Sequence, residues 1–311
     1  MISRRNLLAA LSALPLMSPS LMFPRRAFAS PAASLKLWPG SPPGGGGPSG
    51  ATQISAKGAA SHIASPALEV FAPAQPNGRA VLIAGGGGYK RIEIANEAYP
   101  AAQWLNDRGI TAFVLTYRLP PEGWVDGPLA PLQDAQRAIR LIRARAADHR
   151  LDPQKIGLLG FSAGGHLMGM AAARADFASY APVDDADKVS ARPDFAALAY
   201  PVITLQPPYD NTVTRRSLIG EHPSSEAGAE WSVETHVGPG CPPVFLVQAD
   251  DDPIANPENT RIMEKACQRA GVPVERHALP SGGHGFGMGV PGSASAQWPA
   301  WYQDWLGHTD A

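Results

Sequence analysis

The stretch from Ile156 to His166, I-G-L-L-G-F-S-A-G-G-H, constrains the fold more than any other part of this chain. Its first six residues predict a buried strand, and the residues after Gly164 favour a helix. Between them lies G-x-S-x-G, the pattern of a nucleophile elbow, in which a serine occupies a sharp turn from strand to helix. Glycines two residues before and after Ser162 leave room for the adjoining backbone. We therefore predict that Ser162 is a catalytic nucleophile.

The first 29 residues have the pattern of an export signal. Arg4 and Arg5 precede an apolar stretch from Leu7 to Phe23, as in twin-arginine signals. Ala27-Phe28-Ala29 fits the small-x-small rule, so we expect cleavage before Ser30. Two prolines and three serines interrupt the apolar stretch, which favours a cleaved signal over a membrane anchor. We expect a periplasmic or secreted protein that is not bound to the membrane.

Charge argues against two classes of partner. Removing residues 1–29 takes four arginines and no acids from a chain of net charge −1, so 282 residues with a net charge of −5 remain. That length suits one α/β domain with a sizeable core. A chain without a basic face is a poor binder of nucleic acid or anionic membrane.

The two cysteines, Cys241 and Cys267, leave their pairing open. An oxidising compartment permits a disulfide between them, but two buried thiols are an equally good interpretation. Their spacing does not resemble a metal site, and we predict neither a metal nor a cofactor.

Strand-like and helix-like segments alternate along most of the chain. Residues 30–61, rich in Pro, Gly, Ser and Ala, predict an extended, partly disordered arm before a hydrolase domain at 62–311. Residues 202–236 fit neither pattern, and we expect an irregular cap over the site. The alternation predicts a mostly parallel sheet flanked by helices, and together with the nucleophile elbow it favours an α/β-hydrolase fold. The predicted strands are residues 67–71, 80–84, 111–117, 156–161, 195–200, 243–248 and 274–279, and the predicted helices are residues 101–107, 132–147, 257–269 and 298–306.

A catalytic serine needs a neighbouring base, and α/β-hydrolase triads follow the chain order Ser, acid, His. His284 fits that order, because it lies in a glycine-rich loop after the last predicted strand. His166, four residues after Ser162, shares its helix face but should lie below the elbow, so we favour a packing or hydrogen-bonding role. His277 within a strand and His308 near the end of the chain are weaker candidates.

Three adjacent acids follow the predicted strand at 243–248, where the triad acid belongs: Asp250, Asp251 and Asp252. We favour Asp252, because it directly precedes a short segment that leads into a helix, and Asp251 remains the alternative. The acid would hold the imidazole tautomer and stabilise the imidazolium. A surface turn or a calcium site is the competing interpretation of the cluster.

Acyl transfer also requires N–H donors for the oxyanion. Ala163, directly after the nucleophile, would supply one. The run Gly85–Gly88 follows an early predicted strand, and glycines allow close backbone approach. We assign Gly87 and Gly88 as further donors, with Gly86 nearly as suitable. A phosphate-binding loop does not fit, because no G-K-[ST] follows.

Six motifs together give the chain a family resemblance over most of residues 35–307. It resembles the bacterial acetyl xylan esterase and feruloyl-esterase-like α/β-hydrolases. Two positions depart from the usual pattern: Gly85 stands where lipase-type oxyanion motifs begin with His, and Ala255-Asn256 where Val-Pro is usual. The motifs are G-G-G-G-Y (85–89), W-L-N-D-R-G-I-T-A-F-V-L-T-Y-R-L-P (104–120), P-L-Q-D-A-Q-R-A-I-R (131–140), G-F-S-A-G-G-H (160–166), A-D-D-D-P (249–253) and G-G-H-G-F-G (282–287).

The resemblance implies a serine carboxylesterase that removes short acyl groups, often acetyl, from carbohydrate such as xylan, and the export signal predicts that it is secreted. Its partner would be a small ester or an acylated oligosaccharide or polysaccharide. It implies a triad of Ser162, Asp252 and His284, with an oxyanion loop at Gly86–Gly88. Alternatives are a feruloyl or lipase-type esterase of the same fold, a dipeptidyl-peptidase-like serine peptidase, and a binding module that has lost its chemistry. The acyl group, the alcohol and the oligomeric state cannot be read from the sequence.

Overall fold

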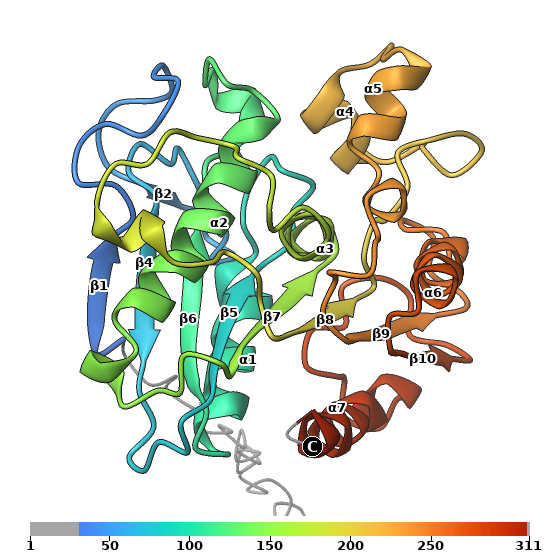
Figure 1. Cartoon of the computed structure of the whole chain (residues 1–311). Coiled ribbons are helices and arrows are strands. Elements are labelled where there is room, and N and C mark those ends of the chain that lie inside the picture. The colour runs from blue at the N-terminus through green and yellow to red at the C-terminus, as the bar shows by residue number, and fades with distance from the viewer. Residues whose placement is uncertain (1–30, 310–311) are drawn as a thin grey trace, which may run out of the picture.

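The computed structural model describes residues 31–309, so the predicted signal at 1–29 lies outside the described residues. An eight-stranded sheet forms the centre, in the order β1-β4-β6-β5-β7-β8-β9-β10 (Figure 1). β1 and β4 run antiparallel to their neighbours, and the other strands pair in parallel, as the alternating pattern predicted. The strands are β1 (Ala33–Lys36), β4 (Ala67–Phe71), β5 (Ala80–Ala84), β6 (Thr111–Thr116), β7 (Ile156–Phe161), β8 (Phe195–Ala199), β9 (Val244–Ala249) and β10 (Val274–Leu279).

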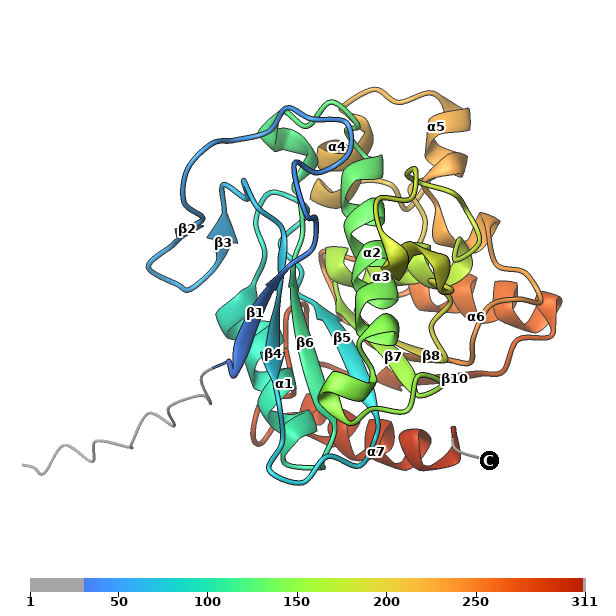
Figure 2. The ribbon, with the colours of Figure 1, turned by 60° about the vertical axis from the view of Figure 1, so that its left-hand side comes forward.

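Successive residues of each strand point to opposite faces of the sheet and feed two separate hydrophobic clusters. In β7, Leu158 belongs to one cluster, and Leu159 and Phe161 belong to the other. Because helices cover both faces, the parallel strands have apolar side chains on both sides. The first face packs against α2 (Leu129–Ala144), α3 (Ala163–Ala173) and α6 (Glu258–Ala270), and the second against α1 (Tyr99–Asn106) and α7 (Trp298–His308) (Figure 2).

Predicted element positions agree with the observed ones to within a few residues. The largest shift is in α2, which begins and ends three residues earlier than the predicted helix at 132–147. It ends at Ala144 because the chain then turns through a short 3₁₀ helix, Ala147–His149, toward β7. A π-helix, Ile94–Ala98, precedes α1 and was not predicted.

The prediction of a partly disordered arm at 30–61 outside the hydrolase domain needs correction. β1 lies within the arm and forms the edge strand of the main sheet. Trp38 is buried, and its Nε1 donates to Asp134 Oδ1 at 2.8 Å. The same carboxylate pairs with the fully buried Arg118, which also donates to the carbonyl of Pro43 at 2.8 Å. Distant residues therefore fix the arm, and its own composition gave no sign of them.

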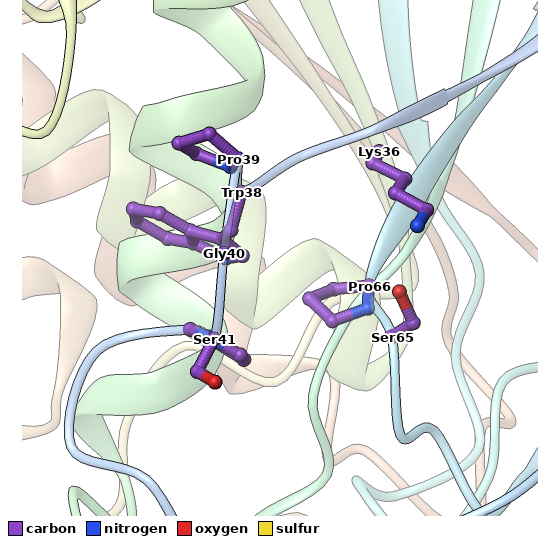
Figure 3. A pocket seen from close by; sticks show the side chains of 8 residues that line it. Lys36, Trp38, Pro39, Gly40, Ser41, Ser65 and Pro66 are labelled. Carbon is purple, nitrogen blue, oxygen red and sulfur yellow. The ribbon is translucent and has the colours of Figure 1, made fainter.

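The arm also carries a two-stranded sheet and encloses a pocket. β2 (Gln53–Ile54) pairs with β3 (Ala60–Ser61). A pocket of about 360 Å³ lies between Lys36–Pro42 and the Ser65–Pro66 segment before β4 (Figure 3). None of the predicted site residues lines this pocket, which belongs to the antiparallel edge of the sheet.

Residues 202–236 are more regular than predicted, because they contain two short helices. α4 (Val213–Ile219) and α5 (Ser225–Glu230) lie together at the top of the view in Figure 1. Over residues 31–309, no helix has the length and apolar character needed to cross a membrane. Cys241 and Cys267 are both buried free thiols in this structure.

Candidate active site

Ser162 occupies a strained turn between β7 and α3. Its φ of 52° and ψ of −117° lie outside the regions that most residues adopt. A Cβ at Gly160 would lie 2.4 Å from the carbonyl oxygen of Gly164, and one at Gly164 would lie 2.2 Å from that of Ala84. Only glycine fits at either position, so these contacts explain why the turn needs both glycines.

A continuous line of hydrogen bonds joins Ser162, His284 and Asp252. The Oγ of Ser162 lies 2.8 Å from His284 Nε2, and His284 Nδ1 lies 2.8 Å from Asp252 Oδ2. The carboxylate can only accept, so Nδ1 carries the hydrogen and Nε2 is free to accept the serine proton. The structure therefore brings together the three residues selected from the sequence, from loops after β7, β9 and β10.

The Asp252 carboxylate is held from behind. Its side chain has no exposed surface, and its Oδ1 accepts the backbone N–H groups of Ile254 and Ala255, both at 2.9 Å. These donors orient Oδ2 toward His284. The Ala255-Asn256 departure from the family pattern therefore leaves the carboxylate anchored, because backbone amides make the contact.

The two neighbouring acids have other partners. Asp251 Oδ1 accepts the N–H groups of Gly282 and Gly283, at 2.9 and 2.8 Å, and so shapes the loop that carries His284. Asp250 is exposed and lies 3.7 Å from Arg261. Among residues 31–309, no group of three or more His, Cys, Asp or Glu side chains is arranged to hold a metal ion.

The glycine loop after β5 lies directly beside the nucleophile. A Cβ at Gly86 would lie 2.8 Å from that of Ser162. The Gly86 N–H donates to Glu97 Oε2 at 2.5 Å, so this amide is already engaged. Gly87 and Gly88 follow with positive φ angles, 115° and 64°. Of the three glycines considered from the sequence, the structure leaves Gly87 and Gly88 as the candidate donors.

Ala163 supplies the remaining candidate donor. It is the first residue of α3, where a helix leaves its N–H groups without intrahelical partners. The positive end of the helix dipole lies at the same point and favours developing negative charge. Tyr117 secures the far end of the glycine loop, because its hydroxyl donates to the carbonyl of Gly85 at 2.8 Å. That bond anchors the loop at the position where the family pattern has His.

His166 has the hydrogen-bonding role predicted for it. It is buried in α3, with Nδ1 2.9 Å from the Tyr89 hydroxyl and Nε2 2.7 Å from the carbonyl of Trp231. The carbonyl can only accept, so Nε2 carries the hydrogen and Nδ1 accepts from Tyr89. Burial lowers the pKa of His166 to about 4. The ring is neutral and fully occupied.

Sequence reasoning missed Glu97 and Tyr200. Glu97 is buried and contacts the glycine loop, and the hydroxyl of Tyr200 donates to its Oε1 at 2.9 Å. Burial raises the pKa of Glu97 to about 7. A single acid eleven residues after Gly86 resembles an ordinary surface glutamate, so no local motif identified it.

A pocket of about 330 Å³ adjoins the triad acid. Tyr209, Asn211 and Thr212 line one side of it, directly before α4. Ile254 and Asn256 line the other side, after Asp252. Apart from Asp252, whose carboxylate contacts His284, the lining contains no Asp, Glu, Lys, Arg or His.

Val213, the residue after Thr212, links this pocket to the glycine loop. A Cβ at Gly88 would lie 2.7 Å from Val213 Cγ1, so α4 begins against the glycine loop. Val213 is 37% exposed, and Ile254, which lines the pocket, is 55% exposed.

A family model, BD-FAE, matches residues 68–267, more than half of the chain. The chain belongs to the BD-FAE family of α/β-hydrolase esterases. The matched region contains Ser162, Asp252 and the glycine loop, whereas His284 lies beyond its end.

Two curated relatives and one solved structure are similar to this member of the BD-FAE family. The chain is 31% identical over 236 residues to an acetylxylan esterase of Xylanibacter ruminicola, covering 71% of this chain and 43% of the relative. It is 34% identical over 206 residues to endo-1,4-beta-xylanase B of Butyrivibrio fibrisolvens, covering 66% and 32%. The chain thus spans less than half of either relative.

The solved structure covers nearly the whole molecule. It is an acetyl ester-xyloside bifunctional hydrolase from Caldicellulosiruptor lactoaceticus, with a TM-score of 0.76 and 31% identity. The match covers 90% of this chain and 97% of the other. The predicted α/β-hydrolase fold is confirmed.

Proposed function

We propose that this protein is a serine carboxylesterase that hydrolyses short acyl esters, acetyl above all, on carbohydrate such as xylan. The observation that carries the proposal is the unbroken line of 2.8 Å contacts from Ser162 through His284 to Asp252. The names of the two xylan-related relatives and of the solved hydrolase support the substrate class.

The reaction follows from the geometry of the three residues. His284 Nε2 takes the hydroxyl proton as Ser162 Oγ attacks the ester carbonyl, and Asp252 stabilises the resulting imidazolium. The tetrahedral oxyanion accepts N–H bonds from the oxyanion donors, Gly87, Gly88 and Ala163. His284 then protonates the leaving alcohol, and an acyl-enzyme remains. Water, activated by the same imidazole, releases the acid and restores Ser162.

The pocket beside Asp252 supports a neutral alcohol side. Besides Asp252, its polar lining groups are amides, a hydroxyl and a phenol, which suit the hydroxyls and ring faces of a sugar. Tyr209 is the aromatic residue that lines the pocket, and it is partly exposed. Trp124 is buried, so it is less suited to stack on a sugar. We assign the alcohol of the ester to this pocket, with Tyr209 as its stacking surface.

Export is part of the proposal, because polymeric carbohydrate lies outside the cytoplasm. The twin-arginine pattern at Arg4 and Arg5 supports it. Replacing both arginines by Lys should leave the protein in the cytoplasm, as cell fractionation would show. A variant exported as efficiently as the native chain would contradict the twin-arginine route.

The decisive experiment compares the mature protein with Ser162→Ala. Substrates are p-nitrophenyl acetate, longer p-nitrophenyl esters, acetylated xylan and methyl ferulate. We expect preference for acetyl, and loss of activity in the variant by about three orders of magnitude or more. Equal rates in both proteins would end the serine-esterase proposal. Activity confined to long chains or to ferulate would assign a lipase or a feruloyl esterase instead, and a dipeptide p-nitroanilide tests the peptidase alternative.

A further inference from the structure

Glu97 is a buried carboxylate that touches the oxyanion loop. It is 4% exposed and lies in the π-helix before α1. Oε2 accepts the N–H of Gly86 at 2.5 Å, and Oε1 accepts the hydroxyl of Tyr200 at 2.9 Å. Both oxygens of Glu97 thus accept from neutral donors, a backbone amide and a phenol. Burying a carboxylate without a cationic partner costs free energy. A buried carboxylate at this position therefore indicates a role that an apolar residue could not fill.

Tyr200 extends the contact to the loop that carries His284. Its hydroxyl oxygen accepts the N–H of Gly287 at 3.0 Å while its hydrogen goes to Glu97. Its ring meets the His284 ring edge to face, with centroids 5.0 Å apart. Tyr200 itself has a φ of 37°, a strained conformation directly after β8. The strain and these bonds place one hydroxyl between the two loops.

The charged and titratable groups around Glu97 come from four segments. Glu93 precedes the π-helix and raises the pKa of Glu97, whereas His284 lowers it. The phenols of Tyr117 from β6 and Tyr200 from β8 are neutral, because burial raises the pKa of each far above its usual range. Burial is the largest influence on Glu97 and brings its pKa to about 7.

We propose that ionised Glu97 is a positioning residue that holds the oxyanion loop and the His284 loop in register through Gly86 and Tyr200. The inference rests on the proposed esterase function and deepens it. Gly86 precedes the assigned donors Gly87 and Gly88, so fixing its amide sets where they point. Gly287 follows His284 by three residues, so fixing its amide limits movement of the imidazole.

Protonation would break this arrangement. The Gly86 N–H can only donate, so a proton on Oε2 would face another donor. A proton on Oε1 would have to go to the Tyr200 oxygen, and the Tyr200 hydrogen would lose its acceptor. At least one bond of the chain is lost in either case. Full activity should therefore require a deprotonated Glu97 in addition to a neutral His284.

The test compares Glu97→Gln with Glu93→Gln. Gln has the shape of Glu but stays neutral, and Glu93 is a nearby carboxylate whose side chain contacts Arg91 and Asn96 instead of the loop. For Glu97→Gln we expect kcat on p-nitrophenyl acetate to fall about 10- to 100-fold, with KM within about threefold, because misplaced groups penalise the transition state. Glu93→Gln should change kcat by less than about threefold.

The pH profile separates positioning from simple folding support. From pH 8 down to about pH 6, log(kcat/KM) should fall more steeply in the native protein than in Glu97→Gln, because protonation of Glu97, whose pKa is about 7, adds to the loss. An unchanged slope together with native kcat would overturn the proposal. If Glu97→Gln does not fold, Tyr200→Phe decides: a native kcat and pH profile there would overturn it equally.

A second readout separates this inference from the proposed function. An aryl phosphonate that labels the catalytic serine reports on the nucleophile and the oxyanion site without any carbohydrate. Labelling should be absent in Ser162→Ala and about tenfold or more slower in Glu97→Gln. Labelling of Ser162→Ala would contradict the proposed function. Equal labelling rates in the native protein and Glu97→Gln would contradict the inference alone.

Discussion

Two histidines next to Ser162 have similar hydrogen-bond counts and opposite roles. His166 has one ring nitrogen on the Tyr89 hydroxyl and the other on the carbonyl of Trp231. His284 has one on the Ser162 hydroxyl and the other on the Asp252 carboxylate. The difference is the carboxylate: an imidazole that donates to a charged acceptor can hold a second proton, whereas one that donates to a carbonyl in a buried site cannot.

Their locations reinforce this difference. The His166 residue is 1% exposed, inside α3, and burial lowers its pKa to about 4. The His284 side chain is 15% exposed on a glycine-rich loop, where substrate and water can reach it. The histidine close to Ser162 in sequence is thus a structural group, and the one 122 residues away completes the proposed triad.

Replacing His284 by Gln should give the largest effect on activity. The hydroxyl of Ser162 loses its base, so we expect kcat to fall by about 10⁴- to 10⁶-fold. The thermal midpoint should move little, because the side chain is partly exposed on a loop. Measuring both kcat and the midpoint tests the contrast. A His284→Gln protein that is unstable but active would contradict the catalytic role assigned to His284.

Asp252→Asn should follow, with a loss of about 10⁴-fold in kcat. The Asn amide would donate to Nδ1 and force the hydrogen onto Nε2, which then cannot take the serine proton. Asp251→Asn is the matched control, since its amide oxygen can still accept from Gly282 and Gly283. We expect that variant to stay within about tenfold of the native rate. A larger loss at Asp251 than at Asp252 would show that the wrong acid had been assigned.

The triad residues could be predicted from the sequence, whereas the choice among the loop glycines could not. Ser162, Asp252 and His284 could be selected because each follows a strand in a recognisable local pattern, and parallel strands bring their carboxyl ends to one edge. Gly87 and Gly88 were distinguished from Gly86 only by a bond to Glu97, which no motif signals. Features set by a short local segment could therefore be predicted, and contacts between distant segments could not.

The N-terminal arm shows the opposite case. Its composition resembles that of a disordered linker, yet Trp38 donates to Asp134, which pairs with the buried Arg118. Asp134 lies 96 positions after Trp38, and Arg118 lies 75 positions after Pro43, so no short window of sequence contains the whole interaction. Composition describes an isolated segment, and burial of the arm depends on a surface that exists only after the sheet has formed.

His166→Leu should affect stability more than activity. It leaves the Tyr89 hydroxyl and the Trp231 carbonyl buried without partners, which costs about 2–4 kcal/mol of unfolding free energy. Denaturant unfolding at pH 8 measures this loss. Below the unfolding transition, kcat should remain within about threefold of native. Tyr89→Phe, which removes one of the two bonds, should cost about half as much. A catalytic collapse in a folded His166→Leu protein would contradict a purely structural role.

The stability cost of His166→Leu should also vary with pH. Folding lowers the pKa of His166 from 6.5 to about 4, so the unfolded chain binds the extra proton in this window. Its stabilising contribution is complete above about pH 6.5 and is lost as the pH falls toward 4, by about 3 kcal/mol. The penalty of His166→Leu should shrink accordingly on acidification.

Glu97 changes the stability of the protein with pH in the opposite direction to His166. Folding raises its pKa from 4.5 to about 7, so its contribution is complete below pH 4.5 and is lost as the pH rises through 7. Between pH 4.5 and 6.5 these two groups therefore offset each other in the native protein. In His166→Leu the Glu97 trend is no longer opposed, so the variant should gain stability relative to native as the pH falls across this window. Unfolding curves of both proteins at pH 5, 6 and 7 measure that difference, and parallel curves would mean that His166 keeps its proton equilibrium on folding.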